Sequence, residues 1–256
     1  MEQFSRIQRF LGEERFERLR SRRVIVVGLG AVGGHVVEGL VRAGINNLCL
    51  VDFDTIQPSN LNRQILALTD TIGRAKVEVA RERVLAINSD CRVEALQLFA
   101  DTGTMDQILT PRPDLLIDAI DSLNPKVQLL TEAYRRDIPI ISSMGAALRT
   151  DPTLIRCADI FDSKKCPLAR RLRTRLRRNG VDRGILCVFS TEDVNFAYDE
   201  PEREMQLGDG LYENRGRTRR ILGSLPTLTG IFGLIIANQA ILRLAEQDPC
   251  PKGKTT

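Results

Sequence analysis

The sequence contains a single histidine, His35, and no tryptophan among its 256 residues. A metal site built from several histidines is therefore excluded, and a Ser-His-Asp triad would have to use His35 itself. The six cysteines form no C-x-x-C pair, so the spacing of a structural zinc cage is absent. No charged segment followed by an apolar core opens the chain, which argues against a secreted disulfide protein. These absences favour a cytoplasmic enzyme.

Long apolar runs are also missing. The most apolar segment, residues 225–244, is interrupted by polar side chains. These are Thr227, Thr229, Asn238, Gln239 and Arg243. Its uninterrupted part, residues 230–237, is far shorter than the roughly 20 apolar residues that span a membrane. We therefore expect a core or interface helix and predict no transmembrane span.

The patterns that are present predict one domain over residues 1–256. Apolar and β-branched runs predict strands at 24–27, 47–52, 92–96, 114–118 and 138–142. Helical spacing predicts helices at 32–43, 74–87, 126–136 and 225–244, after a short amphipathic helix within the first twenty residues. This alternation predicts a Rossmann-like α/β fold, a doubly wound and mainly parallel sheet with helices on both faces. We expect a basic helical insertion at 164–183 and a flexible loop at 196–220.

A glycine-rich turn follows the first predicted strand and opens a helix. It reads Gly28-Leu29-Gly30-Ala31-Val32-Gly33. Glycine lets the backbone approach a phosphate closely, and a helix N-terminus supplies N–H groups and the positive end of its dipole. Asp52 ends the next predicted strand, where a carboxylate can accept the ribose hydroxyls. These features predict a nucleotide site, although NAD- and FAD-dependent enzymes share them.

The residues after Asp52 distinguish between classes of nucleotide. A polar loop ends in Arg63 and Gln64, and Lys76 stands at the start of a predicted helix. An NAD-dependent oxidoreductase needs no such pair of cations, whereas an enzyme that cleaves a triphosphate between its α and β phosphates does. We predict that Arg63 binds phosphate oxygens and that Lys76 contacts the α-phosphate.

Two aspartates close another predicted strand in the run Asp118-Ala119-Ile120-Asp121-Ser122. Ligands bind at the carboxyl ends of parallel strands, so both carboxylates are expected near the site. Asp121 is the better placed to hold Mg2+ bound to phosphates. Asp118 either contacts the ligand or faces the neighbours of its own strand.

Together these motifs resemble the E1-like (ThiF/MoeB-type) adenylating superfamily. The segments GLGAVG, VDFDTIQPSNLNRQ, GRAKVE and DAIDS occur in the same order. The resemblance implies ATP and Mg2+ as cofactors and one nucleotide site. Its residues would be Gly28, Gly30, Ala31, Val32, Gly33, Asp52, Asp54, Asn60, Arg63, Gln64, Lys76, Asp121 and Ser122. The family also has a basic residue near the N-terminus, often supplied across a dimer interface; here Arg6 and Arg9 are both candidates for this catalytic role.

Within the superfamily, the chain is similar to the tRNA threonylcarbamoyladenosine dehydratase branch over nearly its full length. Supporting segments are residues 4–12, 120–122, 151–153, 167–169 and 187–192. The similarity implies a homodimer that dehydrates N6-threonylcarbamoyladenosine in tRNA through an acyl-adenylate. The alternative is adenylation of the C-terminal glycine of a ubiquitin-like sulfur-carrier protein, although such activators usually carry two C-x-x-C zinc pairs. A sulfur-carrier or cysteine-desulfurase-associated protein stays a candidate partner.

Positive charge is concentrated in one segment. Residues 164–183 carry a net charge of +8, although the whole chain carries only +4. Leu168, Leu172 and Leu176 recur every four residues, which predicts an amphipathic helix with buried leucines. Its arginines are Arg170, Arg171, Arg173, Arg175, Arg177 and Arg178. We predict that they bind tRNA phosphates; the alternative is a solvated face paired with the acidic stretch 199–213.

Cys187 is the candidate reactive thiol, because related activators use a cysteine to accept the activated acyl group. The alternative is a small buried hydrophobe within the segment LCVF. Ring closure inside the substrate side chain requires no enzyme nucleophile. We interpret His35 as a structural or surface residue.

Overall fold

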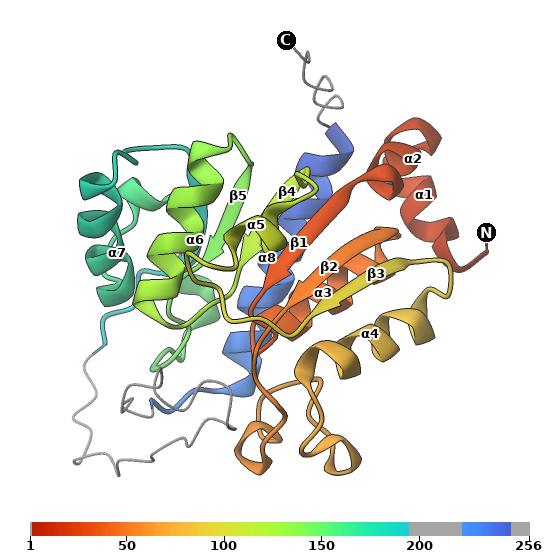
Figure 1. Cartoon of the computed structure of the whole chain (residues 1–256), viewed down its shortest axis with the longest axis horizontal. Helices are drawn as coiled ribbons and strands as arrows, with labels where there is room; N and C mark the ends of the chain where they lie inside the picture. Colours follow the sequence, from red (N-terminus) through yellow and green to blue (C-terminus); the bar gives the residue numbers. More distant parts are fainter. Residues whose placement is uncertain (1, 195–221, 247–256) are drawn as a thin grey trace.

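The computed structural model describes residues 2–194 and 222–246, so the loop expected at 196–220 lies outside the described residues. Within them, one sheet has the strand order β3-β2-β1-β4-β5-β7-β6 (Figure 1). Neighbouring strands are parallel, except for the antiparallel pair β6 and β7. The strands are β1 (Arg23–Val27), β2 (Asn47–Val51), β3 (Arg92–Leu96), β4 (Leu115–Asp118), β5 (Ile140–Ser143), β6 (Ile155–Asp159) and β7 (Ile185–Ser190).

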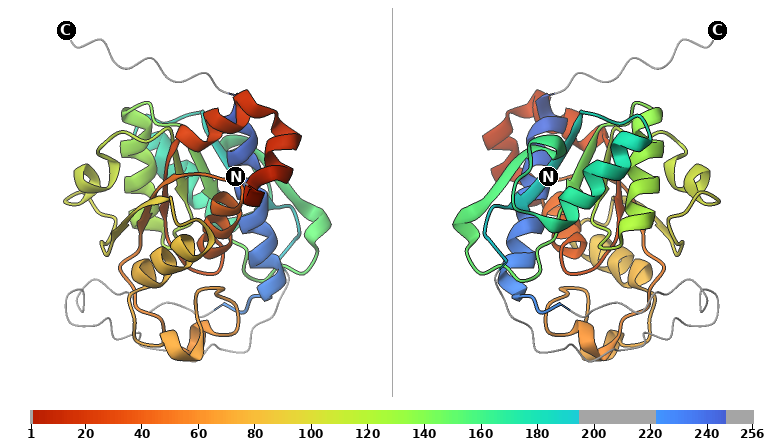
Figure 2. Two further views of the ribbon diagram at one scale, coloured as in Figure 1. Left: turned by 90° about the vertical axis from the view of Figure 1, so that its right-hand side faces the viewer. Right: turned by 90° about the vertical axis from the view of Figure 1, so that its left-hand side faces the viewer.

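Helices cover both faces of this sheet (Figures 1 and 2). One hydrophobic core joins the sheet to α3, α4 and α8, and a second core joins its other face to α5, α6 and α7. The helices are α1 (Ser5–Leu11), α2 (Glu13–Ser21), α3 (Gly33–Arg42), α4 (Lys76–Ile87), α5 (Met105–Leu109), α6 (Leu123–Arg135), α7 (Pro167–Arg178) and α8 (Pro226–Glu246). The predicted doubly wound α/β fold is confirmed.

The five predicted strands correspond to β1–β5, with boundaries within two residues, and the predicted helices correspond to α3, α4, α6 and α8. The first helix is divided into α1 and α2 at Gly12, whose φ of +82° ends the helical path. The sequence did not locate β6, because this short edge strand exposes Arg156 and Cys157 and has no continuous apolar run. The basic segment contains α7, which connects β6 to β7 and buries Leu172 and Leu176 in the core.

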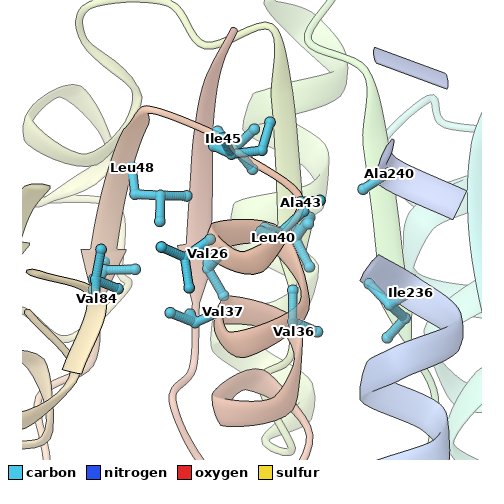
Figure 3. Packing of buried hydrophobic residues seen from close by; sticks show 14 of the residues in the cluster. Val26, Val36, Val37, Leu40, Ala43, Ile45, Leu48, Val84, Ile236 and Ala240 are labelled. Atoms are coloured by element: carbon cyan, nitrogen blue, oxygen red, sulfur yellow. The ribbon is translucent and has the colours of Figure 1, made fainter. Parts of the chain in front are cut away.

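The contact between α3 and α8 depends on small residues. Ile236 and Ala240 of α8 lie beside Val36 and Leu40 of α3, which itself packs on the sheet (Figure 3). A β-carbon on Gly233 would lie 2.5 Å from the Val32 carbonyl oxygen, so glycine is required at this approach. Of the helices in the described residues, α8 is long and apolar enough to cross a membrane. However, 56% of its most apolar 18-residue stretch is buried within this protein. Its buried face belongs to the core, which agrees with the core or interface helix expected from the sequence.

His35 belongs to the same contact. Its Nδ1 lies 2.9 Å from the Ala31 carbonyl oxygen, and a β-carbon on Gly230 would lie 3.2 Å from its Nε2. The half-buried histidine thus fills space between α3 and α8, which agrees with its interpretation as a structural or surface residue.

We expect Gly233→Ala to destabilise the protein by about 1–3 kcal/mol, because the added methyl group meets backbone atoms that cannot move aside. Urea unfolding followed by circular dichroism measures this loss. Gly103→Ala is the matched control, since the nearest atom to its β-carbon would be Asp101 Oδ1 at 3.4 Å. Equal stability of the two variants would contradict the proposed constraint.

Candidate functional site

The carboxyl ends of β1, β2 and β4 meet at one edge of the sheet, where Gly28, Asp52 and the turn 119–122 follow them. Gly28 has a φ of +92°, and a β-carbon there would lie 2.8 Å from the Ala119 carbonyl oxygen. A β-carbon on Gly33 would lie only 1.7 Å from the Gly28 carbonyl oxygen. Both glycines are therefore needed to bring the glycine-rich turn against the turn after β4.

The N-terminus of α3 faces this edge without a side-chain cap. Its N-cap residue is Val32, whose side chain has no oxygen to offer the first N–H groups of the helix, although the Gly34 N–H is bound by the Gly30 carbonyl oxygen. Gln64 lies over Gly30, with its Nε2 at 3.9 Å from the place of a β-carbon there. Gln64 is only 8% exposed, and its Oε1 is a buried oxygen without a hydrogen-bond partner. The N-terminus of α3 suits an anionic ligand such as a nucleotide phosphate, whereas the unpaired Gln64 Oε1 is an acceptor and suits a hydrogen-bond donor of a ligand.

Asp52 connects this turn to the end of β2. Its Oδ2 accepts a hydrogen bond from the Leu29 N–H at 2.7 Å, and its Oδ1 accepts one from the Asp54 N–H at 2.9 Å. Burial raises the pKa of Asp52, although the Lys76 ammonium and these two N–H groups oppose that effect. Each carboxylate oxygen has a further lone pair, so the predicted ribose contact is compatible with both bonds.

Lys76 is buried among carboxylates. Its Nζ lies 2.9 Å from Asp54 Oδ2, and the side chain is 6% exposed. Burial by itself would lower the pKa of Lys76, but Asp52, Asp54 and Asp121 outweigh burial and hold that pKa above its ordinary value. Lys76 is thus a charged, desolvated cation rather than a solvated surface lysine. A phosphate that entered the site would replace carboxylate as its partner.

The loop after β2 is held together by its own polar groups. Asn60 is buried, and its Oδ1 accepts a hydrogen bond from the Gln57 N–H at 3.1 Å. Its carbonyl oxygen accepts hydrogen bonds from the N–H groups of Arg63 and Gln64. The half-buried Arg63 donates from Nη1 to the Ser59 carbonyl at 2.8 Å. Asn60 therefore shapes the loop that carries Arg63 and Gln64, and direct contact of Asn60 with a nucleotide stays a prediction.

The two aspartates after β4 differ in environment. Asp118 is fully buried, accepts a hydrogen bond from Ser142 Oγ at 2.6 Å and lies 2.6 Å from Lys126 Nζ. It faces the neighbours of its strand, which decides between the two alternatives left by the sequence. Asp121 is exposed just before α6, whose N-cap is Ser122. Lys126, a fully buried lysine of α6, has no signal in the sequence that marks it as part of this edge.

A metal ion at this edge would depend on the nucleotide. Within the described ranges, no group of three or more His, Cys, Asp or Glu side chains is arranged to hold one. Asp121 fits the single carboxylate that Mg2+ takes from a protein when phosphates supply further oxygens. Its role as a magnesium ligand stays a prediction.

Arg6 and Arg9 lie away from this edge. Both are exposed on α1, and Phe4, just before α1, packs against Phe16 of α2 with ring centroids 5.9 Å apart. Because α2 leads into the first residue of β1, this pair of helices lies toward the opposite edge of the sheet (Figure 1). Within one chain the structure does not bring either arginine to the site.

The arginines of α7 fall into two groups. Arg170, Arg171, Arg177 and Arg178 are exposed on one helix face, and Arg177 also lies over the Phe161 ring at 5.1 Å. Arg173 and Arg175 are half-buried, and they donate hydrogen bonds to Ser163 and Asn124. The helix begins beside Gly145, just after β5, and hence at the edge that carries the nucleotide site. The acidic stretch 199–213 lies outside the described residues.

Cys187 lies inside β7 with no exposed surface. Burial raises the pKa of its thiol far above the ordinary value, with Cys166 and Asp159 adding to that effect. Because the thiolate is the nucleophilic form, these surroundings favour the alternative of a small buried hydrophobe.

We expect iodoacetamide at pH 9 to label Cys157, which is exposed, and to leave Cys187 unlabelled in the folded protein. Partial burial raises the pKa of the Cys157 thiol as well, but its side chain is accessible, whereas the pKa of Cys187 is raised much further and its side chain is fully buried. Peptide mass mapping reads out both sites, and labelling in guanidinium chloride is the control. Rapid alkylation of Cys187 in the native protein would contradict this assignment.

Comparison with known proteins identifies the relatives of this site. A family model described as the ThiF family matches residues 3–255. The chain is 39% identical to tRNA threonylcarbamoyladenosine dehydratase of Bacillus subtilis, over 80% of this chain and 81% of that protein. A crystal structure of the Escherichia coli dehydratase in complex with ATP matches with a TM-score of 0.82 and 31% identity, covering 95% and 93% of the two chains. The Escherichia coli molybdopterin-synthase adenylyltransferase is 35% identical, but only over 53% of each chain.

Proposed function

The chain belongs to the ThiF family, and from this premise we propose that it catalyses the ATP-dependent dehydration of N6-threonylcarbamoyladenosine in tRNA. One observation carries the proposal: similarity to dehydratases of this name extends over about four fifths or more of both chains. Similarity to the molybdopterin-synthase adenylyltransferase covers about half. The absence of C-x-x-C pairs also favours the dehydratase over an activator of a sulfur-carrier protein.

We place ATP across the carboxyl ends of β1, β2 and β4. Asp52 would bind the ribose, and the N-terminus of α3 with Gly30 and Gln64 would lie against the phosphates. The N-terminus of α3, which has no side-chain cap, supports this placement, and Gln64 would donate to the phosphates from Nε2, the end of its amide that lies nearest Gly30. Lys76 would exchange its bond to Asp54 for the α-phosphate, and Arg63 would bind further phosphate oxygens.

The chemistry that this arrangement serves begins with a carboxylate. Its negative charge and resonance make it a poor electrophile, so it must first be activated. An oxygen of the threonine carboxylate attacks the α-phosphorus, the bond to the β-phosphate breaks, and pyrophosphate leaves. A nitrogen or hydroxyl of the same side chain then attacks the acyl carbon, loses its proton and expels AMP. The carboxylate oxygen lost by the substrate departs within AMP, and no enzyme nucleophile takes part.

Positively charged groups lower the barrier to both steps. Lys76 and Arg63 would stabilise the charge that develops on the α-phosphate and on the leaving pyrophosphate. Bound Mg2+, held by Asp121 and phosphate oxygens, would supply further charge neutralisation. Holding the carboxylate in line with the α-phosphorus removes much of the entropic cost of reaction.

The remaining parts of the proposal concern partners. A homodimer is required if Arg6 or Arg9 reaches ATP, because neither approaches the site within its own chain. A tRNA substrate agrees with the cytoplasmic location expected from the sequence. A sulfur-carrier or cysteine-desulfurase-associated protein remains a candidate partner, supported only by the family resemblance.

We expect Lys76→Ala and Asp121→Ala each to lower the rate of dehydration by about 100-fold or more, because each removes a charge placed at the phosphates. The assay incubates enzyme and ATP with threonylcarbamoylated tRNA and measures loss of one water from the nucleoside by mass spectrometry. Arg92→Ala, which changes an exposed side chain on β3, is the control and should retain full activity. Intact activity in both site variants would refute the assignment.

Pyrophosphate exchange distinguishes the sulfur-carrier alternative. Exchange that required a protein with a Gly-Gly tail instead of tRNA would favour that alternative.

We expect Arg170→Gln with Arg171→Gln to weaken tRNA binding by about 10-fold or more, since each removed cation costs one phosphate contact. Fluorescence anisotropy with labelled tRNA at fixed salt measures this loss. Arg81→Gln with Arg92→Gln removes the same charge from exposed positions on α4 and β3 and should change affinity much less. Equal losses in the two double variants would show that only net charge matters and would remove α7 as the tRNA surface.

A further inference from the structure

We propose that Lys126 is a positioning residue, which fixes the turn that carries Asp121 by means of its buried ion pair with Asp118. This inference rests on the proposed function, since it concerns how the same site presents a carboxylate to the nucleotide. Neither Asp118 nor Lys126 faces the phosphates directly, so both would act through the backbone of the turn.

The side chains of Asp118 and Lys126 bind the N–H and the carbonyl group of the same residue, Ile120. Lys126 Nζ lies 2.6 Å from Asp118 Oδ2, and both side chains have 0% exposure. Lys126 Nζ also donates a hydrogen bond to the Ile120 carbonyl oxygen at 2.9 Å. Asp118 Oδ1 accepts one from the Ile120 N–H at 3.1 Å. Both polar backbone groups of Ile120 are thus bound by the ion pair, and the next residue is Asp121.

The turn held in this way packs directly on the glycine-rich turn. The Ala119 N–H donates to the Val27 carbonyl at 2.8 Å, and a β-carbon on Gly28 would lie 2.8 Å from the Ala119 oxygen. On its other side, Asp121 is close enough to act on the charge of Lys76. A shift of the turn would therefore move Asp121 relative to both groups that are proposed to hold the phosphates.

Stability alone is a poor explanation for this pair. Removing two charges from water costs roughly as much as their attraction returns, and apolar residues of similar volume often serve a core equally well. The geometry of the pair is specific, because each charge has a second hydrogen bond to the same residue, Ile120. A fixed orientation of the peptide before Asp121 is what such an arrangement provides and what an apolar pair would not.

Ser142 of β5 supplies a matched control. Its Oγ donates to Asp118 Oδ2 at 2.6 Å, so it belongs to the same buried cluster. It makes no hydrogen bond to Ile120 among the described contacts, and its removal leaves both bonds to that residue in place. Ser142→Ala should therefore affect stability without moving the turn.

The experiment compares Lys126→Met, the double variant Asp118→Asn with Lys126→Met, and Ser142→Ala. The double variant removes both charges, so it avoids leaving Asp118 unpaired in the core. Calorimetry measures ATP binding in EDTA, electron paramagnetic resonance measures Mn2+ binding to the enzyme–ATP complex, and the water-loss assay gives kcat and KM. We expect the double variant to bind ATP alone within about threefold of wild type, with Mn2+ affinity and kcat each lowered by about 10-fold or more. Ser142→Ala should keep Mn2+ affinity and kcat within about twofold of wild type, whatever its melting temperature.

A folded double variant with wild-type Mn2+ affinity and kcat would overturn the proposal, as would an equal loss in Ser142→Ala. If neither Lys126 variant folds, amide exchange of Ile120 in the wild-type protein decides. Protection like that of β4 supports the proposal, and exchange at the rate of an exposed loop overturns it. Failure of the proposed function has a different signature: the wild-type enzyme would then remove no water from the nucleoside, while the ATP and Mn2+ measurements would still report on the turn.

Discussion

The close approach of two backbone turns at the carboxyl edge of the sheet is the constraint on which the rest of the site depends. The glycine-rich turn after β1 touches the turn after β4, and any β-carbon at Gly28 or Gly33 would collide with backbone atoms. Because this contact is made by main chain, it fixes the start of α3 and the position of Asp121 at the same time. Asp52 extends the constraint to β2 by accepting the Leu29 N–H. Three strands thus contribute to one rigid edge.

Charge in this edge is arranged in two groups. Beneath the surface, Asp118 and Lys126 neutralise each other and bind the backbone of Ile120. Separately, the Lys76 ammonium is held by carboxylates whose attraction exceeds the cost of its burial. The pair of Asp118 and Lys126 sets geometry, and Lys76 offers a charge that can change partners. This division lets one part of the site stay fixed while another part responds to a nucleotide.

The sequence predicted those features that depend on local pattern. The glycine turn, Asp52 and Lys76 are recognisable because strand, turn and helix follow one another within short stretches. Lys126 was not predicted, because its place in the helical pattern does not show that its side chain is buried beside Asp118. The edge strand β6 was missed since Arg156 and Cys157 face solvent in a segment of only five residues. The separation of Arg6 and Arg9 from the site depends on the tertiary arrangement of α1 and α2, which no local sequence pattern encodes.

The fold separates the six arginines of α7 into two groups, which the sequence alone does not distinguish. Arg173 and Arg175 are engaged by Ser163 and Asn124, which leaves four exposed arginines along the outer face. Each phosphate neutralised by a protein cation releases condensed counterions and adds roughly 0.7 to 0.9 to the slope of log affinity against log salt. The four outer arginines of α7 are therefore expected to contribute most to the ionic-strength dependence of a polyanion bound along this helix. Arg173 and Arg175 instead tie α7 to the segment before it and to the start of α6 through bonds to the neutral residues Ser163 and Asn124.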